Sequence, residues 1–298
     1  MSHNKHIVFI NNSIDGATAF LMLKWLSGNK KLQSVTVTKK SFRHIFTKWI
    51  ANNNLDEYKR LYVINVDVSE FTDILPSDKL VVIDNNPNHV TNHYHKETTK
   101  LVYPERSCTH IIYEVFQSKF NVELTKQQKV LMLLVNDYAS YSFSLKGSYE
   151  LGLIFGNYQG DKAQKFCREF YAGFNRFLPE HQTIINFYKN KLNDIRDGLE
   201  VFSGLIPIGT KKYTVVGTFA GSFINEISDW LLEEYNGDIS IVINLDDSKV
   251  SFRRKDDCKV DVGQLAKKLA NGGGHKYSAG GFITNDLLTF SKLLKPTR

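Results

Sequence analysis

Short β-rich runs that alternate with helical patterns constrain the first half of this chain more than any other feature. The runs are HIVFI (6–10), SVTVTKK (34–40), RLYVINVDV (60–68), KLVVIDN (79–85) and KLVY (100–103). Helical patterns lie between or after them, over residues 15–28, 42–52 and 107–120. Strands that alternate with helices form βαβ units, so the sequence predicts a mostly parallel sheet flanked by helices.

The second half has a different pattern, because hairpins replace the alternation near residue 204. Two hairpins are predicted, over residues 205–219 and 238–254, together with helices over 222–235, 261–270 and 287–294. Residues 124–203 are mostly helical in pattern. The chain is therefore expected to be an α/β protein with three parts: a parallel-sheet domain over 1–150, a helical linker over 151–203 and a smaller α+β domain over 204–298.

Composition narrows the class of partner. The formal net charge of +7 and the pI near 9.1 favour a polyanionic partner, although the excess of positive charge is modest. No apolar stretch reaches the roughly 18–20 residues of a membrane span, so no membrane is expected as a partner, and the expected location is cytoplasmic. The cysteines, Cys108, Cys167 and Cys258, have no metal-ligand spacing and are interpreted as buried or free thiols.

Aspartates stand where the predicted strands end. Asp15 follows the first strand, Asp67 closes the third and Asp84 closes the fourth, while Asp137 comes from a later helical region. Ligands of a parallel sheet lie beyond the carboxyl ends of its strands, and carboxylate oxygens suit Mg²⁺ or Mn²⁺. The alternative is that each aspartate caps a helix or begins a turn. Three aspartates in equivalent positions favour the metal interpretation.

The stretch NGGGHKYSAGG (271–281) is the other strong local signal. A run of glycines lets backbone N–H groups surround an anion, His275 can add a donor, and Arg253 or Arg254 could bind a phosphate with two N–H groups. The alternative, a glycine-rich end of a helix followed by a turn, explains one or two glycines but not the whole run. The pattern favours a phosphate site formed by Gly272, Gly273, Gly274 and His275.

Two weaker patterns leave their interpretations open. His89, His93 and His95 are clustered in NHVTNHYHK and could bind a metal, but their place after a strand end favours an exposed loop. The basic stretch KKSFRH (39–44) is interpreted as the end of a strand. It could attract an oligonucleotide or could be an ordinary solvated edge.

Several motifs resemble those of the DHH phosphoesterase superfamily over nearly the whole chain. VVIDNNPNH (81–89) resembles the signature of that family, whose fourth strand ends in Asp-His-His-Pro. The first, second and fourth family motifs resemble NNSIDGATAF (11–20), INVDVS (64–69) and LLVNDYAS (133–140). The stretch from KVSFRR (249–254) through the glycine run resembles the DHH-associated C-terminal domain, which is the most specific of these matches.

The resemblance implies a metal site that has lost some of its ligands. Members of the family hold a pair of Mn²⁺ ions, which generate the attacking hydroxide. The matching positions make Asp15, Asp67 and Asp137 the expected metal ligands. The motif at Asp84, Asn85 and Asn86, expected to be the degenerate catalytic motif, has asparagine at both histidine positions. The first motif has likewise lost a histidine and an aspartate, at positions now occupied by Asn11 and Ser13.

An all-oxygen ligand set suits Mg²⁺ or Ca²⁺ better than Mn²⁺. The cofactor alternatives are therefore one Mg²⁺ or Mn²⁺ ion, or no metal. In the C-terminal domain, the resemblance implies that Arg253, the glycines and His275 bind the nucleotide end of a ligand across a cleft between the domains.

These expectations lead to three hypotheses. The first is a protein that binds a short oligonucleotide, a dinucleotide or a nucleotide phosphate with weakened or lost hydrolysis. The second is an active metal-dependent phosphodiesterase or exonuclease of the RecJ or oligoribonuclease type, acting on short RNA or DNA. The third is a non-catalytic subunit whose former catalytic face binds a protein partner, with a homodimer as a further option.

Overall fold

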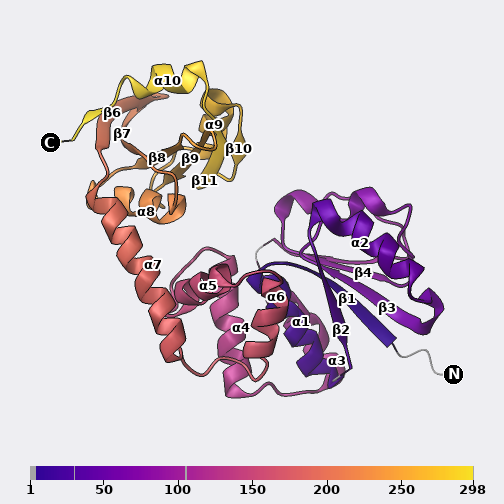
Figure 1. Ribbon diagram of the computed structural model, residues 1–298. Helices are drawn as coiled ribbons and strands as arrows, with labels where there is room; N and C mark the ends of the chain where they lie inside the picture. The colour runs from indigo at the N-terminus through magenta and orange to yellow at the C-terminus, as the bar shows by residue number, and fades with distance from the viewer. Residues whose placement is uncertain (1–4, 30, 105, 298) are drawn as a thin grey trace. The chain divides into compact units, whose positions relative to one another are not determined.

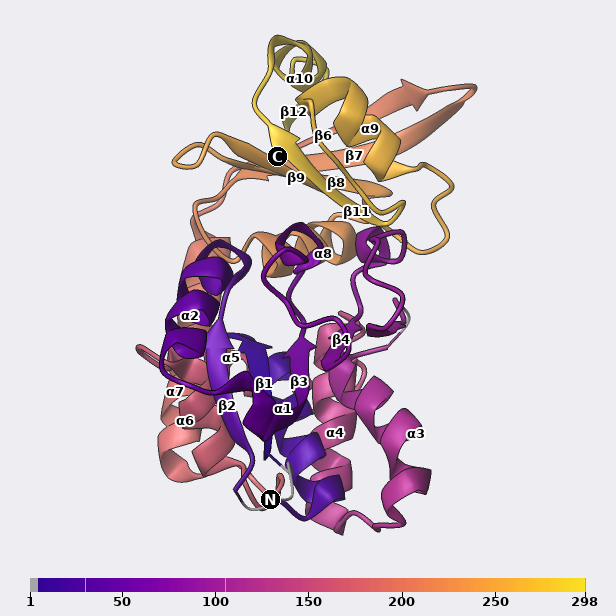
Figure 2. The same ribbon diagram turned by 90° about the vertical axis from the view of Figure 1, so that its right-hand side faces the viewer.

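The computed structural model describes residues 5–29, 31–104 and 106–297, and it divides into two compact units, Met1–Asn186 and Phe187–Arg298 (Figures 1 and 2). Each unit is built on one sheet with helices on both faces. The expected α/β class with a smaller mixed C-terminal domain is confirmed.

The first unit contains a five-stranded sheet in the order β2-β1-β3-β4-β5, and every neighbouring pair is parallel. This confirms the predicted parallel sheet. Its strands are β1 (Lys5–Asn11), β2 (Gln33–Val37), β3 (Tyr58–Ile64), β4 (Leu80–Asp84) and β5 (Thr99–Val102). Its helices are α1 (Ile14–Ser27), α2 (Lys39–Ala51), α3 (Cys108–Phe120), α4 (Lys126–Ala139), α5 (Ser148–Asn157) and α6 (Lys162–Glu169), with 3₁₀ turns η1 (Leu55–Glu57), η2 (Ser69–Phe71) and η3 (Pro87–His89).

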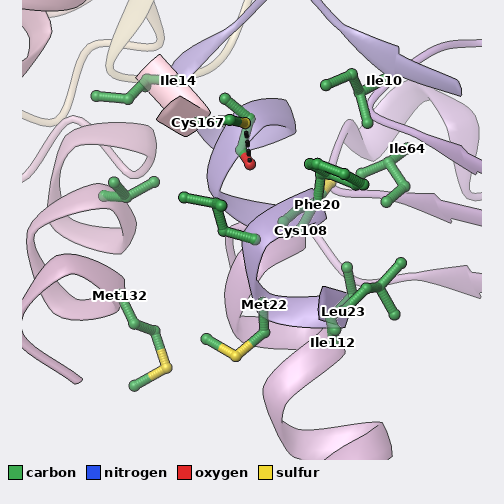
Figure 3. Close-up of a cluster of buried hydrophobic side chains, with 14 of the residues drawn as sticks. Ile10, Ile14, Phe20, Met22, Leu23, Ile64, Cys108, Ile112, Met132 and Cys167 are labelled. Atoms are coloured by element: carbon green, nitrogen blue, oxygen red, sulfur yellow. Dashed lines mark hydrogen bonds between the residues drawn. The ribbon is translucent and has the colours of Figure 1, made fainter. Parts of the chain in front are cut away.

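Alternating side chains of β1 form two cores, one on each face of this sheet. Val8 and Ile10 pack with α1, α3 and α4, and part of this larger cluster is drawn in Figure 3. Phe9 packs on the opposite face against the rings of Phe42 and Phe46 from α2. The helices thus cover both faces of the sheet and leave the ends of its strands as the place for polar side chains.

The second unit contains a seven-stranded sheet in the order β10-β11-β9-β8-β7-β6-β12, in which β7 and β8 are parallel and the other pairs are antiparallel. Both predicted hairpins are present. Helix α8 covers one face of this sheet, while α9 and α10 cover the other (Figure 2). The elements are β6 (Val201–Ile208), β7 (Lys211–Phe219), α8 (Ile224–Glu234), β8 (Ile239–Asn244), β9 (Lys249–Arg254), α9 (Val262–Ala270), β10 (Gly273–Gly274), β11 (Ser278–Phe282), α10 (Asn285–Ser291) and β12 (Lys295–Pro296).

The region expected to be a helical linker, 151–203, is divided between the two units. Helices α5 and α6 bury Leu151, Phe155 and Phe166 in the core of the first unit. Helix α7 (Pro179–Asp197) contains the boundary between Asn186 and Phe187. Among the helices in the described stretches of the chain, none has the length and apolar character needed to cross a bilayer.

One predicted strand ends earlier than its sequence pattern suggests. Thr38 has extended backbone angles and accepts a hydrogen bond from the Ser41 N–H, while the Ser41 hydroxyl bonds back to the Thr38 N–H. This reciprocal capping starts a helix at Lys39. The interpretation of KKSFRH (39–44) as the end of a strand is therefore wrong, and its basic residues lie in the first turns of α2.

Candidate functional site

Three neighbouring strands bring polar side chains to the same edge of the first sheet. Ile10 of β1 pairs with Ile64 of β3, and Ile64 pairs with Ile83 of β4. The residue that follows each of these isoleucines along the chain is polar: Asn11, Asn65 and Asp84. The carboxyl edge of the sheet is thus a polar centre.

Asn65 connects several parts of this centre, and sequence analysis did not identify it. Its backbone has a φ of +59°, a left-handed conformation that asparagine tolerates better than most residues. Its Nδ2 lies 3.3 Å from both Asp15 Oδ2 and Asn85 Oδ1, and its Oδ1 accepts a hydrogen bond from Asn11 at 3.2 Å. The sequence signal for Asn65 is that it directly follows the apolar run of β3.

Asp15 lies in the first turn of α1, whose N-cap is the Ser13 hydroxyl. Its buried carboxylate faces the N-terminus of a second helix, α3. Its oxygens accept hydrogen bonds from the Cys108 N–H at 2.8 Å, the Thr109 N–H at 2.9 Å and the Thr109 hydroxyl at 2.8 Å. A helix N-terminus favours a negative charge. Burial nevertheless raises the pKa of Asp15, because it outweighs the opposing effect of these donors.

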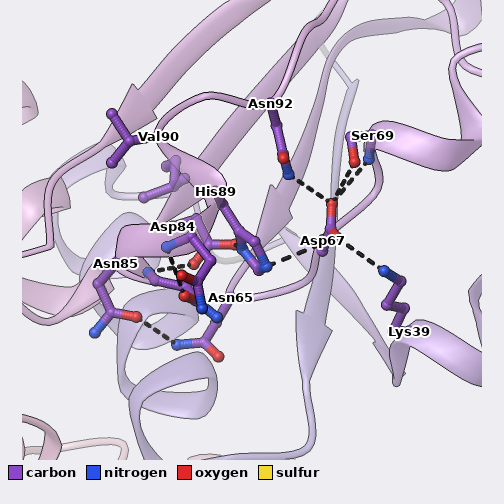
Figure 4. A network of polar contacts seen from close by, with 12 residues as sticks. Lys39, Asn65, Asp67, Ser69, Asp84, Asn85, His89, Val90 and Asn92 are labelled. Carbon is purple, nitrogen blue, oxygen red and sulfur yellow. Dashed lines mark hydrogen bonds and ion pairs between the residues drawn. The ribbon is translucent and has the colours of Figure 1, made fainter. Parts of the chain in front are cut away.

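Asp67 is surrounded by four polar residues, Lys39, Ser69, His89 and Asn92 (Figure 4). Its Oδ1 accepts from the Ser69 N–H at 3.1 Å, the Ser69 hydroxyl at 2.7 Å and Asn92 Nδ2 at 2.9 Å. Its Oδ2 lies 2.9 Å from Lys39 Nζ and 3.6 Å from His89 Nε2. Burial alone would raise the pKa of Asp67. The hydrogen bonds from Lys39 and Ser69 and the charge of His89 have the larger, opposite effect and lower the pKa to about 2.

His89 joins Asp67 to Asp84. Its Nδ1 lies 2.8 Å from Asp84 Oδ2, and the second oxygen of Asp84 accepts from the Asn86 N–H at 2.9 Å (Figure 4). The side chain of His89 is 19% exposed. The expectation that the histidine cluster forms an exposed loop is therefore wrong for His89, because the short turn η3 directs its ring back toward the end of β4.

The rest of the histidine cluster and the two asparagines of the third motif have separate roles. His93 and His95 are exposed, as expected. Asn86 Oδ1 accepts from the Asn88 N–H at 3.0 Å and so caps η3, whereas Asn85 Oδ1 accepts from Asn65. The two positions that hold histidines in the family motif are thus used for a turn cap and for the network around Asn65.

Asp137 anchors a loop. Its buried carboxylate accepts from the Ser144 N–H at 3.1 Å, the Ser144 hydroxyl at 2.6 Å, the Leu145 N–H at 3.1 Å and the Ser148 hydroxyl at 2.5 Å. Burial alone would raise the pKa of Asp137, but the hydrogen bonds from these donors have the larger, opposite effect, so the pKa lies below its usual range. Within the anchored loop, Tyr141 and Phe143 have positive φ angles, which are costly for bulky residues.

This arrangement does not fit a metal ion bound by Asp15, Asp67 and Asp137 together. Among the residues that the structure describes, no group of three or more His, Cys, Asp or Glu side chains could hold a metal ion. The oxygens of these carboxylates already accept N–H and O–H donors, as described above. A metal ion binds through lone pairs on the oxygens, and hydrogen-bond donors already use those lone pairs here.

Arg253, in the second unit, pairs with an acidic residue of the same unit. Its Nη1 lies 2.9 Å from Asp229 Oδ1 and 3.1 Å from Asp229 Oδ2, and its side chain is 15% exposed. Its neighbour Arg254 instead packs its guanidinium group 4.2 Å from the centre of the Tyr277 ring and donates to the Lys276 carbonyl. In this arrangement the Asp229 carboxylate holds the group that was expected to bind phosphate.

The glycine run forms a short strand and a turn. Gly273 and Gly274 form β10, which pairs with β11, and the backbone N–H of the exposed His275 donates to the Ser278 carbonyl at 2.9 Å. A Cβ atom on Gly272 would lie 1.9 Å from the Gly280 oxygen. Close backbone packing therefore requires glycine at position 272 whether or not an anion binds there. Phosphate binding by these residues stays a prediction.

Comparisons with known proteins agree with this fold. Residues 213–295 match the model of the DHHA1 domain. The pGpG-specific phosphodiesterase PggH from Vibrio cholerae is similar in structure, with a TM-score of 0.57 and 14% identity over 97% of this chain and 96% of that chain. An exopolyphosphatase-related protein from Bacteroides fragilis has a TM-score of 0.52, with 11% identity over 98% of this chain and 91% of that chain.

The exonuclease RecJ bound to manganese is also similar, with a TM-score of 0.50 and 11% identity over 97% of this chain and 88% of that chain. No curated protein matches the sequence. At these identities the structural likeness establishes the fold alone. Together with the matched domain, it shows that this chain has the fold of the DHH superfamily and carries a DHHA1 domain at residues 213–295.

Proposed function

We propose that this chain binds a short oligonucleotide, a dinucleotide or a nucleotide phosphate and hydrolyses it weakly or not at all. The ligand class is supported by the fold, which it shares with a pGpG-specific phosphodiesterase and an exonuclease, and by the net charge of +7. The observation that carries the loss of hydrolysis is that the carboxylates of Asp15, Asp67 and Asp137 are filled by N–H and O–H donors of the chain itself.

The physical reason concerns the attacking water. A bound metal ion makes hydroxide available at neutral pH by lowering the pKa of its water. Carboxylates that accept hydrogen bonds on both oxygens offer a metal few lone pairs, and Asn85 and Asn86 replace two imidazole groups by weaker neutral amide ligands. Binding does not require this chemistry. Gly272, Gly273, Gly274, His275 and Arg253 are the residues that we propose for the nucleotide end of the ligand.

The second candidate is an active metal-dependent phosphodiesterase or exonuclease on short RNA or DNA. It is favoured by the aspartates at positions 15, 67, 84 and 137, which keep the residue type of the family motifs. A ligand that displaced the donors around Asp67 would expose its oxygens to a metal.

Calorimetry and a turnover assay separate these candidates. The purified chain is titrated with pGpG, a short RNA and a short DNA, first with EDTA and then with millimolar Mn²⁺. We expect binding in EDTA that weakens as salt is added, because phosphate contacts release counterions, with little or no cleavage in Mn²⁺. His275→Ala should weaken this binding.

The matched pair Asp67→Ala and Asp73→Ala tests catalysis. Asp73 is an exposed aspartate of the same unit that pairs with Arg43. Metal-dependent turnover that Asp67→Ala abolishes and Asp73→Ala leaves intact would establish the second candidate and overturn the first. Absence of both binding and turnover for all three ligands would overturn both.

A further inference from the structure

The second unit contains an apolar pocket between α10 and the sheet. Helix α10 lies on the face of this sheet opposite to α8 (Figure 1). The pocket has a volume of about 160 Å³, and every residue that lines it is uncharged and belongs to the second unit. Its lining includes Phe202, Phe219 and Ile241 from the sheet and Leu287, Phe290 and Leu294 from α10 and the turn that follows it.

The order of side chains in the sheet leaves room for this pocket. Side chains of a strand alternate between its faces, so Gly217 of β7 lies on the same face as Val215, which belongs to the core beneath α9 and α10. Gly217 pairs with Phe202 of β6 on one side and with Ile241 of β8 on the other. A residue without a side chain thus lies between two large ones. A Cβ atom at position 217 would already lie 3.4 Å from Leu294 Cδ1, so any larger residue would extend into the pocket.

The lining of the pocket is buried at one side and exposed at the other. Leu287 is fully buried and Ile241 is 3% exposed. Phe219, in contrast, is 48% exposed, and its ring meets the ring of Phe202 edge to face, with the ring centres 6.2 Å apart. A ligand can therefore enter beside Phe219 while the core around Leu287 stays packed.

The hydroxyl groups in the lining indicate the class of ligand. They belong to Thr218 and Ser291. The Thr218 hydroxyl donates to the Glu200 carbonyl at 2.7 Å, and the Ser291 hydroxyl donates to the Leu288 carbonyl at 2.9 Å. Both donors are thus already used by the chain itself. A charged ligand would lose its water in this pocket without gaining a charged side chain as a partner, which is costly.

We propose that this pocket binds a small, uncharged apolar group with the size of a benzene ring or a short branched alkyl chain. A protein cavity of about 150 Å³ that is lined by leucine, isoleucine and phenylalanine side chains binds benzene. The volume and the lining of this pocket match that class of ligand. The lining does not include Arg253, His275 or the glycines proposed for the nucleotide, so the inference does not depend on the proposed function.

The test uses benzene as the probe and benzoate as its charged counterpart, with the full chain and without any nucleotide. The methyl resonances of Ile241, Leu287 and Leu294 report on the pocket in two-dimensional NMR spectra. Ser291→Met places a long side chain in the wall of the pocket, whereas Thr289→Met places the same side chain at an exposed position of α10 outside the lining. Thermal unfolding verifies the fold of each variant, and Leu294→Phe serves as a second filling variant should Ser291→Met be unstable.

We expect benzene to shift these methyl resonances in a saturable manner with a Kd of about 1 mM, an affinity that a ligand of six heavy atoms can reach. Benzoate should bind at least about tenfold more weakly, because its charge finds no partner. Ser291→Met should weaken benzene binding at least about tenfold, since its side chain occupies the space of the ring, while Thr289→Met leaves the binding unchanged. Absence of a saturable shift in the natural chain overturns the inference, as does benzene binding that Ser291→Met leaves intact or benzoate binding of equal strength.

Discussion

The role of Asp137 can be tested by truncating its side chain, because its two possible roles predict different results. As a loop anchor, Asp137 accepts hydrogen bonds from the Ser144 N–H and hydroxyl, the Leu145 N–H and the Ser148 hydroxyl. Asp137→Ala removes all of these acceptors at once. As a metal ligand alone, the same residue could be truncated with little effect on folding.

The loss of stability depends on the exposure of the donors that no longer have an acceptor. Ser144 and Leu145 are exposed, so their donors can turn to water at small cost, whereas Ser148 is fully buried. A buried donor left without an acceptor costs about 1–3 kcal/mol, and each lost hydrogen bond of the exposed donors adds roughly 0.5–1 kcal/mol. We expect Asp137→Ala to lower the free energy of unfolding of the first unit by about 2.5–6 kcal/mol.

Urea unfolding followed by tryptophan fluorescence measures this loss. Trp25 and Trp49 report on the first unit once Trp230 of the second is replaced by phenylalanine. The control is Asp73→Ala, which removes an exposed ion pair and should change the stability little, because solvent screens such pairs. If Asp137→Ala costs no more than this control, the loop-anchor interpretation is wrong. Loss of Mn²⁺ binding with unchanged stability would favour the metal-ligand role.

Three further predictions concern other parts of the chain. The pKa of Asp67 is about 2 in the folded chain and near 3.8 when unfolded, so its contribution to stability is present above pH 4 and is lost as the pH falls toward 2. Asp67→Asn should therefore flatten the pH dependence of urea stability in that window. Burial raises the pKa of the Cys108 and Cys167 thiols, to about 12 for Cys167. Mass spectrometry should detect iodoacetamide labelling of both only after unfolding, and labelling of the native chain would contradict this. Gly272→Ala should destabilise the second unit by about 1–3 kcal/mol through overpacking. Gly273→Ala, whose Cβ would meet no atom within 4 Å, should leave its thermal unfolding unchanged.

Much of the fold could be predicted because its elements are encoded locally. The alternation of β-rich runs with helical patterns predicts the parallel sheet, and the apolar runs around short turns predict the two hairpins of the second unit. The predictions fail where a few side chains, or a segment distant in the sequence, determine the local structure. Two hydroxyl groups, on Thr38 and Ser41, end a strand pattern and start a helix. Strand β12 joins its sheet only by pairing with β6, far earlier in the chain.

The candidate site could be predicted in position but not in its contacts. Strand ends indicate Asp67 and Asp84 without further information, because residues after neighbouring parallel strands meet at one edge. The donors that fill these carboxylates come from elsewhere: Lys39 from α2 and His89 from η3. Only the packing of α2 and η3 against the sheet brings these donors to the acids, and no pattern within a single segment encodes that packing.

A retained aspartate is consequently ambiguous evidence for a metal site. Asp15 shows why, because a carboxylate that receives the first N–H groups of α3 has the same residue type and the same place in its motif as one that binds a metal. The physical difference lies in the lone pairs that remain for a cation. On Asp67 these are used by Lys39, Ser69 and Asn92, so the centre balances the charge of its carboxylates with groups of the chain itself. The residue type therefore indicates where a cation could bind. Only the donors around each oxygen show whether groups of the chain already use its lone pairs.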